Sequence, residues 1–204
     1  MPGPDAAFWQ QRFESGDTPW DRGAPSPQLL QWLQEGSLQP CRIAVPGCGS
    51  GWEAVELARR GFAVTAIDLV PAACARTGAR AQQAGVSLEV VQADVLAWRP
   101  DRPFDAVFEQ TCLCAIHPFR WVGYAQALRD WIRPEGALWA MFMQRPRASA
   151  LDEGRIEGPP YHCDVTAMHL LFQSEAWSWP EPPLPKVAHP AGWHELAACL
   201  RRRG

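Results

Sequence analysis

Lysine is almost absent from this chain, since Lys186 is the only one among its 19 basic residues. The sequence also lacks any apolar run close to the ~20 residues that a membrane-spanning helix needs. An excess of positive charge is missing too, because the formal net charge is −3, which argues against a broad nucleic-acid surface. Residues 1–5 carry neither a basic nor an apolar segment, so no signal peptide is expected. No membrane or nucleic-acid partner is therefore predicted.

The composition that remains is that of a globular enzyme-sized domain. Hydrophobic residues make up 47% and charged residues 20% of 204 residues, which excludes disordered and coiled-coil classes and favours one domain, 1–204. Seven cysteines, an odd number, stand without an export signal. Reduced thiols in the cytoplasm explain this better than a disulfide framework. We expect a cytoplasmic monomer or weak homodimer.

The chain divides into a segment of polar and aromatic character, residues 1–40, and a core, residues 41–204, in which strands and helices alternate. After residue 144 the pattern weakens, and residues 193–200 could form either a helix or a final strand. Strands that are separated by helices of 10–15 residues indicate right-handed crossovers and a parallel sheet covered on both faces. Strands are predicted at 42–45, 62–67, 88–92, 104–109 and 137–143, and helices at 52–60, 71–84, 120–132 and 165–173.

A glycine-rich turn, residues 45–51, follows the first core strand and opens a helix. Gly47 and Gly49 allow positive φ and close approach to a ligand, and the helix N-terminus offers N–H groups to an anion. Asp68 ends the next strand, where it can accept hydrogen bonds from ribose hydroxyls. Asp94 follows the third strand, beside the apolar Val95, and can hold an adenine amino group. The alternative interpretation makes both aspartates capping or turn residues.

Two classes of cofactor use such a crevice. A dinucleotide fingerprint started at Gly47 requires a small residue at position 52, where Trp52 stands. Started at Gly49 it reaches Ala54, but its glycines then begin several residues after the strand. About 95 residues remain after Glu109, which leaves little room for a second nucleotide half. S-adenosylmethionine has adenine, ribose and an amino-acid end but no pyrophosphate, and it fits better.

At this point the residues resemble a known family. The turn at 45–51 with Asp68 and Leu69 resembles that of class I S-adenosylmethionine-dependent methyltransferases. Trp9 and the Gly-Asp-Thr-Pro-Trp-Asp-Arg-Gly element at 16–23 are similar to the thiol/halide branch of the thiopurine S-methyltransferase superfamily. The segments 104–105, 114–116 and 158–161 also resemble that branch, and the likeness covers roughly residues 8–172. It implies a Rossmann-like, doubly wound, mostly parallel seven-stranded sheet with helices on both faces.

The resemblance also implies roles for individual residues. An N-terminal lid would cover the cofactor, Asp68 would take its ribose, and Asp94 with Val95 its adenine. Gln110 stands where thiol/halide enzymes have Tyr and thiopurine enzymes have Arg, and Cys112-Leu113 replaces an aromatic pair. These differences from the family pattern affect the expected substrate and not the expected cofactor. The residues expected to bind the cofactor are Trp9, Phe13, Trp20, Gly47, Gly49, Asp68, Leu69, Asp94, Val95 and Gln110.

Methyl transfer from a sulfonium is an in-line displacement, for which the protein supplies binding, orientation and a dry cavity. A thiol, a hydrosulfide or other chalcogenide, or a halide needs little help from a base, so we predict transfer to such a small soft nucleophile. Gln110, Tyr161 and His117 are the candidate catalytic residues. Cys112-x-Cys114-x-x-His117 lacks the second ligand pair of a zinc site, and no metal is predicted. The alternatives are a bulkier oxygen or nitrogen acceptor, a nicotinamide-dependent oxidoreductase and a non-catalytic cofactor-binding module.

Overall fold

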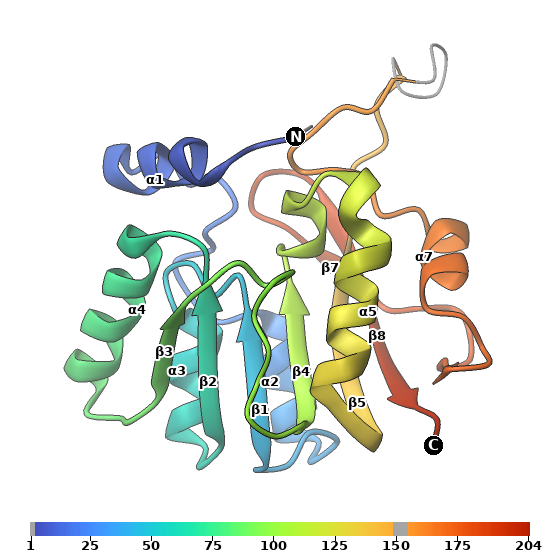
Figure 1. Ribbon diagram of the computed structural model, residues 1–204, viewed down its shortest axis with the longest axis horizontal. Coiled ribbons are helices and arrows are strands. Elements are labelled where there is room, and N and C mark those ends of the chain that lie inside the picture. The colour runs from blue at the N-terminus through green and yellow to red at the C-terminus, as the bar shows by residue number, and fades with distance from the viewer. Residues whose placement is uncertain (1–2, 149–154) are drawn as a thin grey trace.

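A computed structural model describes residues 3–148 and 155–204 and shows one central β-sheet (Figure 1). Strands β1 to β5 run parallel, and β8 lies antiparallel to β5. The strand order is β3-β2-β1-β4-β5-β8-β6, and β7 also pairs with β8. The strands are β1 (Arg42–Pro46), β2 (Ala63–Asp68), β3 (Glu89–Gln92), β4 (Phe104–Gln110), β5 (Ile132–Gln144), β6 (Trp177–Ser178), β7 (Lys186–Ala188) and β8 (His194–Arg202).

The predicted α/β class with a mostly parallel, Rossmann-like sheet is confirmed. The strand count differs from the predicted seven, because the described residues form eight strands. Strands β6 and β7 span only two and three residues and flank a proline-rich stretch, where no alternating pattern marks them. The segment 193–200, for which helix and strand were both open, forms strand β8 from His194 onward.

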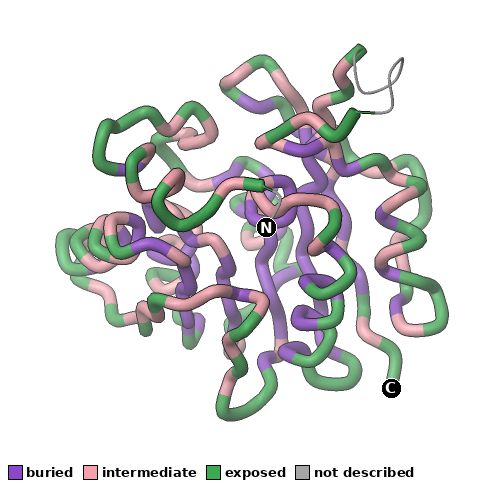
Figure 2. The backbone as a smooth tube through the Cα atoms, turned by 45° about the horizontal axis from the view of Figure 1, so that its top comes forward, coloured by how far each residue is buried: buried purple, intermediate pink, exposed green. Residues whose placement is uncertain are grey.

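Helices cover both faces of the sheet (Figure 1). On one face α2 and α3 pack against β1 and β4 through a cluster that includes Leu29, Trp32 and Leu57. On the other face α5 and α7 pack through Leu128 and Met168. The helices are α1 (Ala6–Ser15), α2 (Pro27–Gln34), α3 (Trp52–Arg59), α4 (Pro71–Ala84), α5 (Trp121–Trp131) and α7 (Val165–Leu171). Buried residues lie mainly in the central strands, and exposed residues lie mainly on the outer helices and loops (Figure 2).

The junction between α5 and β5 differs from the predicted one. The sequence predicts a helix to residue 132, a turn at 134–136 and a strand from 137, whereas β5 already begins at Ile132. In place of the expected turn, β5 contains an irregular segment. Its register with β4 shifts after Ile132, and Glu135 has a φ of +63°.

The parallel strands present their carboxyl ends at one edge of the sheet, and α1 lies above that edge (Figure 1). Asp5 caps α1 by accepting a hydrogen bond from the Phe8 N–H at 2.9 Å. The Gln10 side chain then accepts from the Ala72 N–H at 3.1 Å, which ties α1 to the first turn of α4. Within the described part of the chain, no helix is both long and apolar enough to cross a membrane.

Candidate functional site

A cavity of about 410 Å³ opens at the carboxyl ends of the strands, beneath α1. The N-terminal helix and loop, the ends of β1, β2 and β4, and the loop before β8 contribute to its walls. Tyr161 is the one predicted site residue that does not line this cavity among the described residues. The predicted residues that do line it are Trp9, Phe13, Trp20, Gly47, Gly49, Asp68, Leu69, Asp94, Val95, Gln110 and His117.

The glycine turn packs directly against the loop that follows β4. Gly47 and Gly49 have φ angles of +59° and +53°, a conformation that residues with a Cβ adopt at a cost. A Cβ added to Gly47 would lie only 2.8 Å from Cys112 Cβ. Glycine is therefore required at position 47 for space as well as for backbone conformation, and the turn leaves its backbone open to the cavity.

Replacement of Gly47 by alanine is expected to destabilise the protein by about 2–4 kcal/mol, since positive-φ strain and a steric clash add. Gly61→Ala is the matched control, because Gly61 has a φ of +86° and a Cβ added there would meet nothing within 4 Å among the described residues. Its cost is expected to be about 1–2 kcal/mol, from strain alone. Urea unfolding measures both values. Equal losses in the two variants would show that the contact with Cys112 adds nothing.

Asp68 lies at the floor of the cavity and is only 8% exposed. Its Oδ2 accepts a hydrogen bond from the Gly49 N–H at 2.9 Å, and its Oδ1 accepts one from the Val70 N–H at 3.2 Å. Burial raises the pKa of this carboxyl group, and the backbone N–H donors oppose that rise. Each carboxylate oxygen can accept a second bond, so Asp68 can bind two hydroxyl groups while the glycine turn holds it in place.

Asp94 is more exposed and has partners of its own. Its Oδ1 accepts from the Leu96 N–H at 2.9 Å, and its Oδ2 pairs with Arg120 at 3.1 Å. Asp94 is therefore a turn residue, as the alternative interpretation of the sequence has it. It also lines the cavity, beside the buried Val95.

An aromatic cluster from the N-terminal segment covers the cavity. The rings of Trp9 and Trp20 meet edge to face with centroids 5.4 Å apart, and Phe13 meets Trp20 at 5.9 Å. Asp21 fastens this cluster to the glycine turn, because its carboxylate accepts hydrogen bonds from Ser50 Oγ at 2.5 Å and from Trp52 Nε1 at 2.8 Å. Trp52, which argues against a dinucleotide in the sequence, thus anchors the covering loop.

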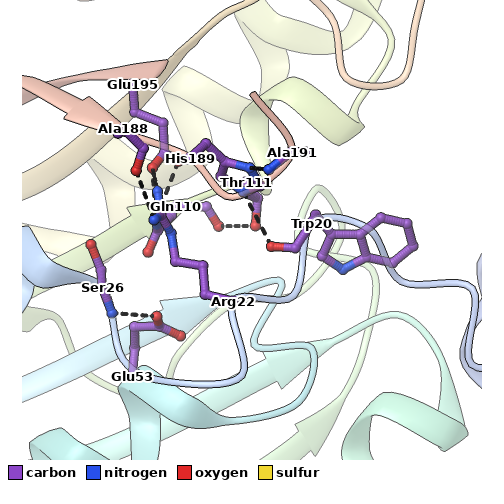
Figure 3. A network of polar contacts seen from close by, with 10 residues as sticks. All are labelled: Trp20, Arg22, Ser26, Glu53, Gln110, Thr111, Ala188, His189, Ala191 and Glu195. Atoms are coloured by element: carbon purple, nitrogen blue, oxygen red, sulfur yellow. Dashed lines mark hydrogen bonds and ion pairs between the residues drawn. The ribbon is translucent and has the colours of Figure 1, made fainter. Parts of the chain in front are cut away.

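A buried ionic network joins the end of β4 to the N-terminal loop and β8 (Figure 3). Glu195 is 0% exposed and pairs with Arg22 at 2.6 Å. Gln110 Nε2 donates to Glu195 Oε2 at 2.9 Å, and Arg22 also donates to the Ala188 carbonyl at 2.9 Å. His189 reaches the Trp20 carbonyl at 3.3 Å. The network fixes the Gln110 amide at the cavity wall and attaches the covering loop to the C-terminal hairpin.

The other two candidate catalytic residues lie side by side. His117 lines the cavity, and its Nδ1 accepts from the Phe119 N–H at 3.3 Å. The neutral ring then carries its proton on Nε2, which makes that atom a donor rather than a base. Tyr161 is 5% exposed and its ring centroid lies 5.3 Å from that of His117. Its N–H donates to the Cys114 carbonyl at 2.7 Å, so Tyr161 supports the wall from behind.

The cysteines next to the cavity are protonated. Burial raises the pKa of the Cys112 and Cys114 thiols well above the ordinary value, so neither supplies a thiolate nucleophile near neutral pH. Among the described residues, no group of three or more His, Cys, Asp or Glu side chains converges to hold a metal ion.

Glu109, beside Gln110 on β4, is a buried carboxyl group that is 1% exposed. Its Oε1 accepts from the Leu113 N–H at 2.6 Å, while Oε2 has no partner among the described residues. Burial, with a smaller contribution from Glu195, raises its pKa from 4.5 to about 7. The folded state therefore keeps this proton up to near neutrality, whereas the unfolded state loses it near its ordinary pKa.

The contribution of Glu109 to stability is thus complete below about pH 4.5 and declines as the pH rises through about 7. Glu109→Gln is expected to remove up to about 3 kcal/mol of the pH-dependent loss between these limits, since a pKa unit corresponds to about 1.4 kcal/mol. Urea unfolding across this pH range tests it, with the surface variant Glu35→Gln as control. An unchanged pH slope in Glu109→Gln would contradict the assignment.

Several residues of the site were not predicted from the sequence. Glu195 and Trp193 belong to a segment whose helix or strand state was open, and Arg145 follows β5 in a region of weak pattern. Arg22 and Asp21 stand inside the 16–23 element, and the element itself was the only indication of their importance.

Comparisons with known proteins show which family the chain resembles in sequence. The family model described as thiopurine S-methyltransferase (TPMT) matches residues 4–179. A probable thiol methyltransferase 2 from Arabidopsis thaliana is 31% identical over 160 residues, which cover 78% of this chain and 68% of that protein. Thiocyanate methyltransferase 1 from the same plant is 29% identical over 166 residues, covering 80% and 70%.

Among solved structures, the N-methyltransferase NodS from Bradyrhizobium japonicum superposes with a TM-score of 0.73 at 21% identity, over 98% of this chain and 100% of that one. This likeness concerns the fold. The family match and the relatives confirm the predicted enzyme class, a methyltransferase, and do not favour an oxidoreductase. By sequence, the chain belongs to the thiopurine S-methyltransferase family.

Proposed function

We propose that this protein transfers the methyl group of S-adenosylmethionine to a small soft nucleophile, a thiol, hydrosulfide or halide. The main support for this proposal is the buried Asp68 carboxylate, which accepts a hydrogen bond from the Gly49 N–H of the glycine turn. The aromatic cluster of Trp9, Phe13 and Trp20 lines the same cavity as a lid. The thiol and thiocyanate methyltransferases among the relatives support a sulfur acceptor.

The cavity has groups for each part of the cofactor. Asp68, with Leu69 beside it, would accept from the ribose hydroxyls, and Asp94 with Val95 would hold the adenine. Gly47 and Gly49 leave room for the amino-acid end. Bound S-adenosylmethionine supplies an activated methyl carbon on a cationic sulfur. The faces of Trp9 and Trp20 would attract that cation by about 0.5–2 kcal/mol, and Phe13 would complete the lid.

The acceptor end of the cavity is suited to a nucleophile that needs no strong base. Gln110 is fixed by Glu195 at the end of β4, and His117 can donate from Nε2. Met143 and Ile116 add apolar wall, which excludes water from the reacting atoms. A thiol has a pKa near 8.5 and is ionised to a few per cent near neutrality, so binding and orientation are the main contributions of these residues. Tyr161 acts by supporting His117.

The proposal also covers the domain organisation, the cellular compartment and the oligomeric state. Residues 1–40 serve as the covering segment and 41–204 as the core of one domain. The protein acts in the cytoplasm as a monomer or weak homodimer on a small molecule, without nucleic acid or membrane.

A panel of acceptors tests the proposed chemistry. Hydrosulfide, iodide, thiocyanate, an aryl thiol and a phenol are offered with S-adenosylmethionine, and release of S-adenosylhomocysteine is measured. Turnover with the sulfur or halide acceptors and little with the phenol is expected. Turnover with the phenol alone would favour the bulkier oxygen or nitrogen acceptor, and tight cofactor binding without any product would favour a non-catalytic module.

A further inference from the structure

Four arginine side chains line the cavity, and Arg145 is distinguished from the others by its partners. Arg12 pairs with Asp17, Arg22 with Glu195, and Arg120 with Asp94. No salt bridge joins Arg145 to a carboxylate among the described residues, and burial together with the like-charged Arg147 lowers its pKa. A guanidinium group at the cavity wall that is not already paired with one of these carboxylates is available to bind an anionic ligand.

Arg145 is held on an aromatic platform. Its guanidinium carbon lies 4.3 Å from the centroid of the Trp193 ring, and the Trp193 ring stacks on His189 with centroids 5.2 Å apart. His189 is itself buried, and the backbone N–H of Arg145 donates to His162 Nδ1 at 3.2 Å, which leaves the guanidinium N–H groups out of that bond. A guanidinium whose central carbon lies over an aromatic ring keeps the N–H donors that do not face the ring for a planar anion such as a carboxylate. The platform therefore pre-organises a bidentate donor.

The sheet register places this platform beyond Gln110. Gln110 pairs with Met141 of β5, and Arg145 follows four residues later, roughly 13 Å further along the strand direction at ~3.3 Å per residue. The last pair of the β5–β8 ladder is Gln144 with His194, so Arg145 and Trp193 stand opposite each other just past it. Arg145 and Gln110 nevertheless line the same cavity. An acceptor that reaches from Gln110 to Arg145 has its anionic group several bonds away from its sulfur atom.

We propose that Arg145 and Trp193 form an anion subsite, and that the acceptor is a thiol which carries a carboxylate at its far end. This inference rests on the proposed function, since it names the acceptor class of the same site. Methyl transfer joins the carbon to the thiolate sulfur and breaks its bond to the sulfonium, while the carboxylate stays bound to Arg145 and unchanged.

The test compares two probes that differ in charge, 3-mercaptopropionate and 3-mercaptopropanamide. The quantity measured is the ratio of kcat/KM for the acid to that for the amide, in wild type, Arg145→Gln and Arg147→Gln. Arg147 is the matched control, because it lies outside the cavity lining and pairs with Glu157 at 3.5 Å. The amount of folded protein cancels in the acid-to-amide ratio of each variant. The intrinsic difference in reactivity between the two thiols cancels when this ratio is compared between variants.

The ratio is expected to fall at least about tenfold in Arg145→Gln, because a charge-assisted hydrogen-bonded pair is lost, and to stay within twofold of wild type in Arg147→Gln. The loss is expected mainly in KM, since the carboxylate is bound equally before and during transfer. Methylation of both thiols with the same ratio in Arg145→Gln and wild type would overturn this inference alone. Methylation of neither thiol, together with a negative acceptor panel, would overturn the proposed function as well.

Discussion

Replacement of Asp68 by asparagine is expected to weaken S-adenosylmethionine binding by about 10–100-fold. Loss of the charge weakens the bonds to the ribose hydroxyls, and a hydrogen bond to a charged group contributes about 1.5–3 kcal/mol. The asparagine amide also has only one oxygen, so it cannot accept from both Gly49 and Val70 as the carboxylate does. The glycine turn then loses one of the contacts that holds it.

Equilibrium dialysis with labelled S-adenosylmethionine measures this effect. Asp105→Asn is the control, because Asp105 is the second residue of β4, at the end of the strand away from the cavity, and its carboxylate accepts from the Arg42 N–H at 3.0 Å and from Arg133 at 2.7 Å. That variant is expected to lose some stability and to keep its Kd within twofold. A Kd within twofold of wild type in Asp68→Asn would remove Asp68 from the cofactor site.

Replacement of Glu195 by alanine is expected to destabilise the fold by about 3–5 kcal/mol, the effect of breaking a buried ion pair by removing one partner. Arg22 would be left largely buried without its counter-ion, and the Gln110 amide would lose its acceptor. For a domain of this size such a loss lowers Tm by about 10 °C. The covering loop would also lose its attachment to β8, so affinity for the cofactor should fall with stability.

A double variant separates the unpaired charge from the loss of the pair. Arg22→Met with Glu195→Met removes both charges, and its stability is expected to lie well above that of Glu195→Ala, since a hydrophobic replacement of a buried pair is often close to neutral. Thermal unfolding of the single and double variants provides the measurement. If both lose the same stability, the coupling between Arg22 and Glu195 is not the source of the effect.

Much of the fold was predictable because local patterns coincide with it. Strands β1 to β4 and helices α3 and α4 fall within about two residues of their predicted bounds, since β1 ends at Pro46, β2 ends at Asp68 and Pro103 precedes β4. The glycine turn and Asp68 were placed together by the rule that the carboxyl ends of parallel strands share an edge. The N-terminal rings were placed on the cavity by the resemblance rather than by periodicity.

The parts of the site that were not predicted depend on contacts distant in sequence. Glu195 reaches Gln110 only because β8 pairs antiparallel with β5, and no local pattern in 193–200 distinguished a strand from a helix. Trp193 meets Arg145 across the same pair of strands. In the sequence Trp52 argues only against a dinucleotide, because its hydrogen bond to Asp21 joins residues 31 positions apart and no local pattern predicts it.

We expect the lid-covered cavity to bind S-adenosylmethionine and not a dinucleotide. Calorimetric titration of the wild-type protein with S-adenosylmethionine, and separately with NAD, measures this directly. We predict saturable binding of one S-adenosylmethionine per chain and no detectable heat with NAD. Binding of NAD, with no detectable binding of S-adenosylmethionine at millimolar concentration, would contradict the claim.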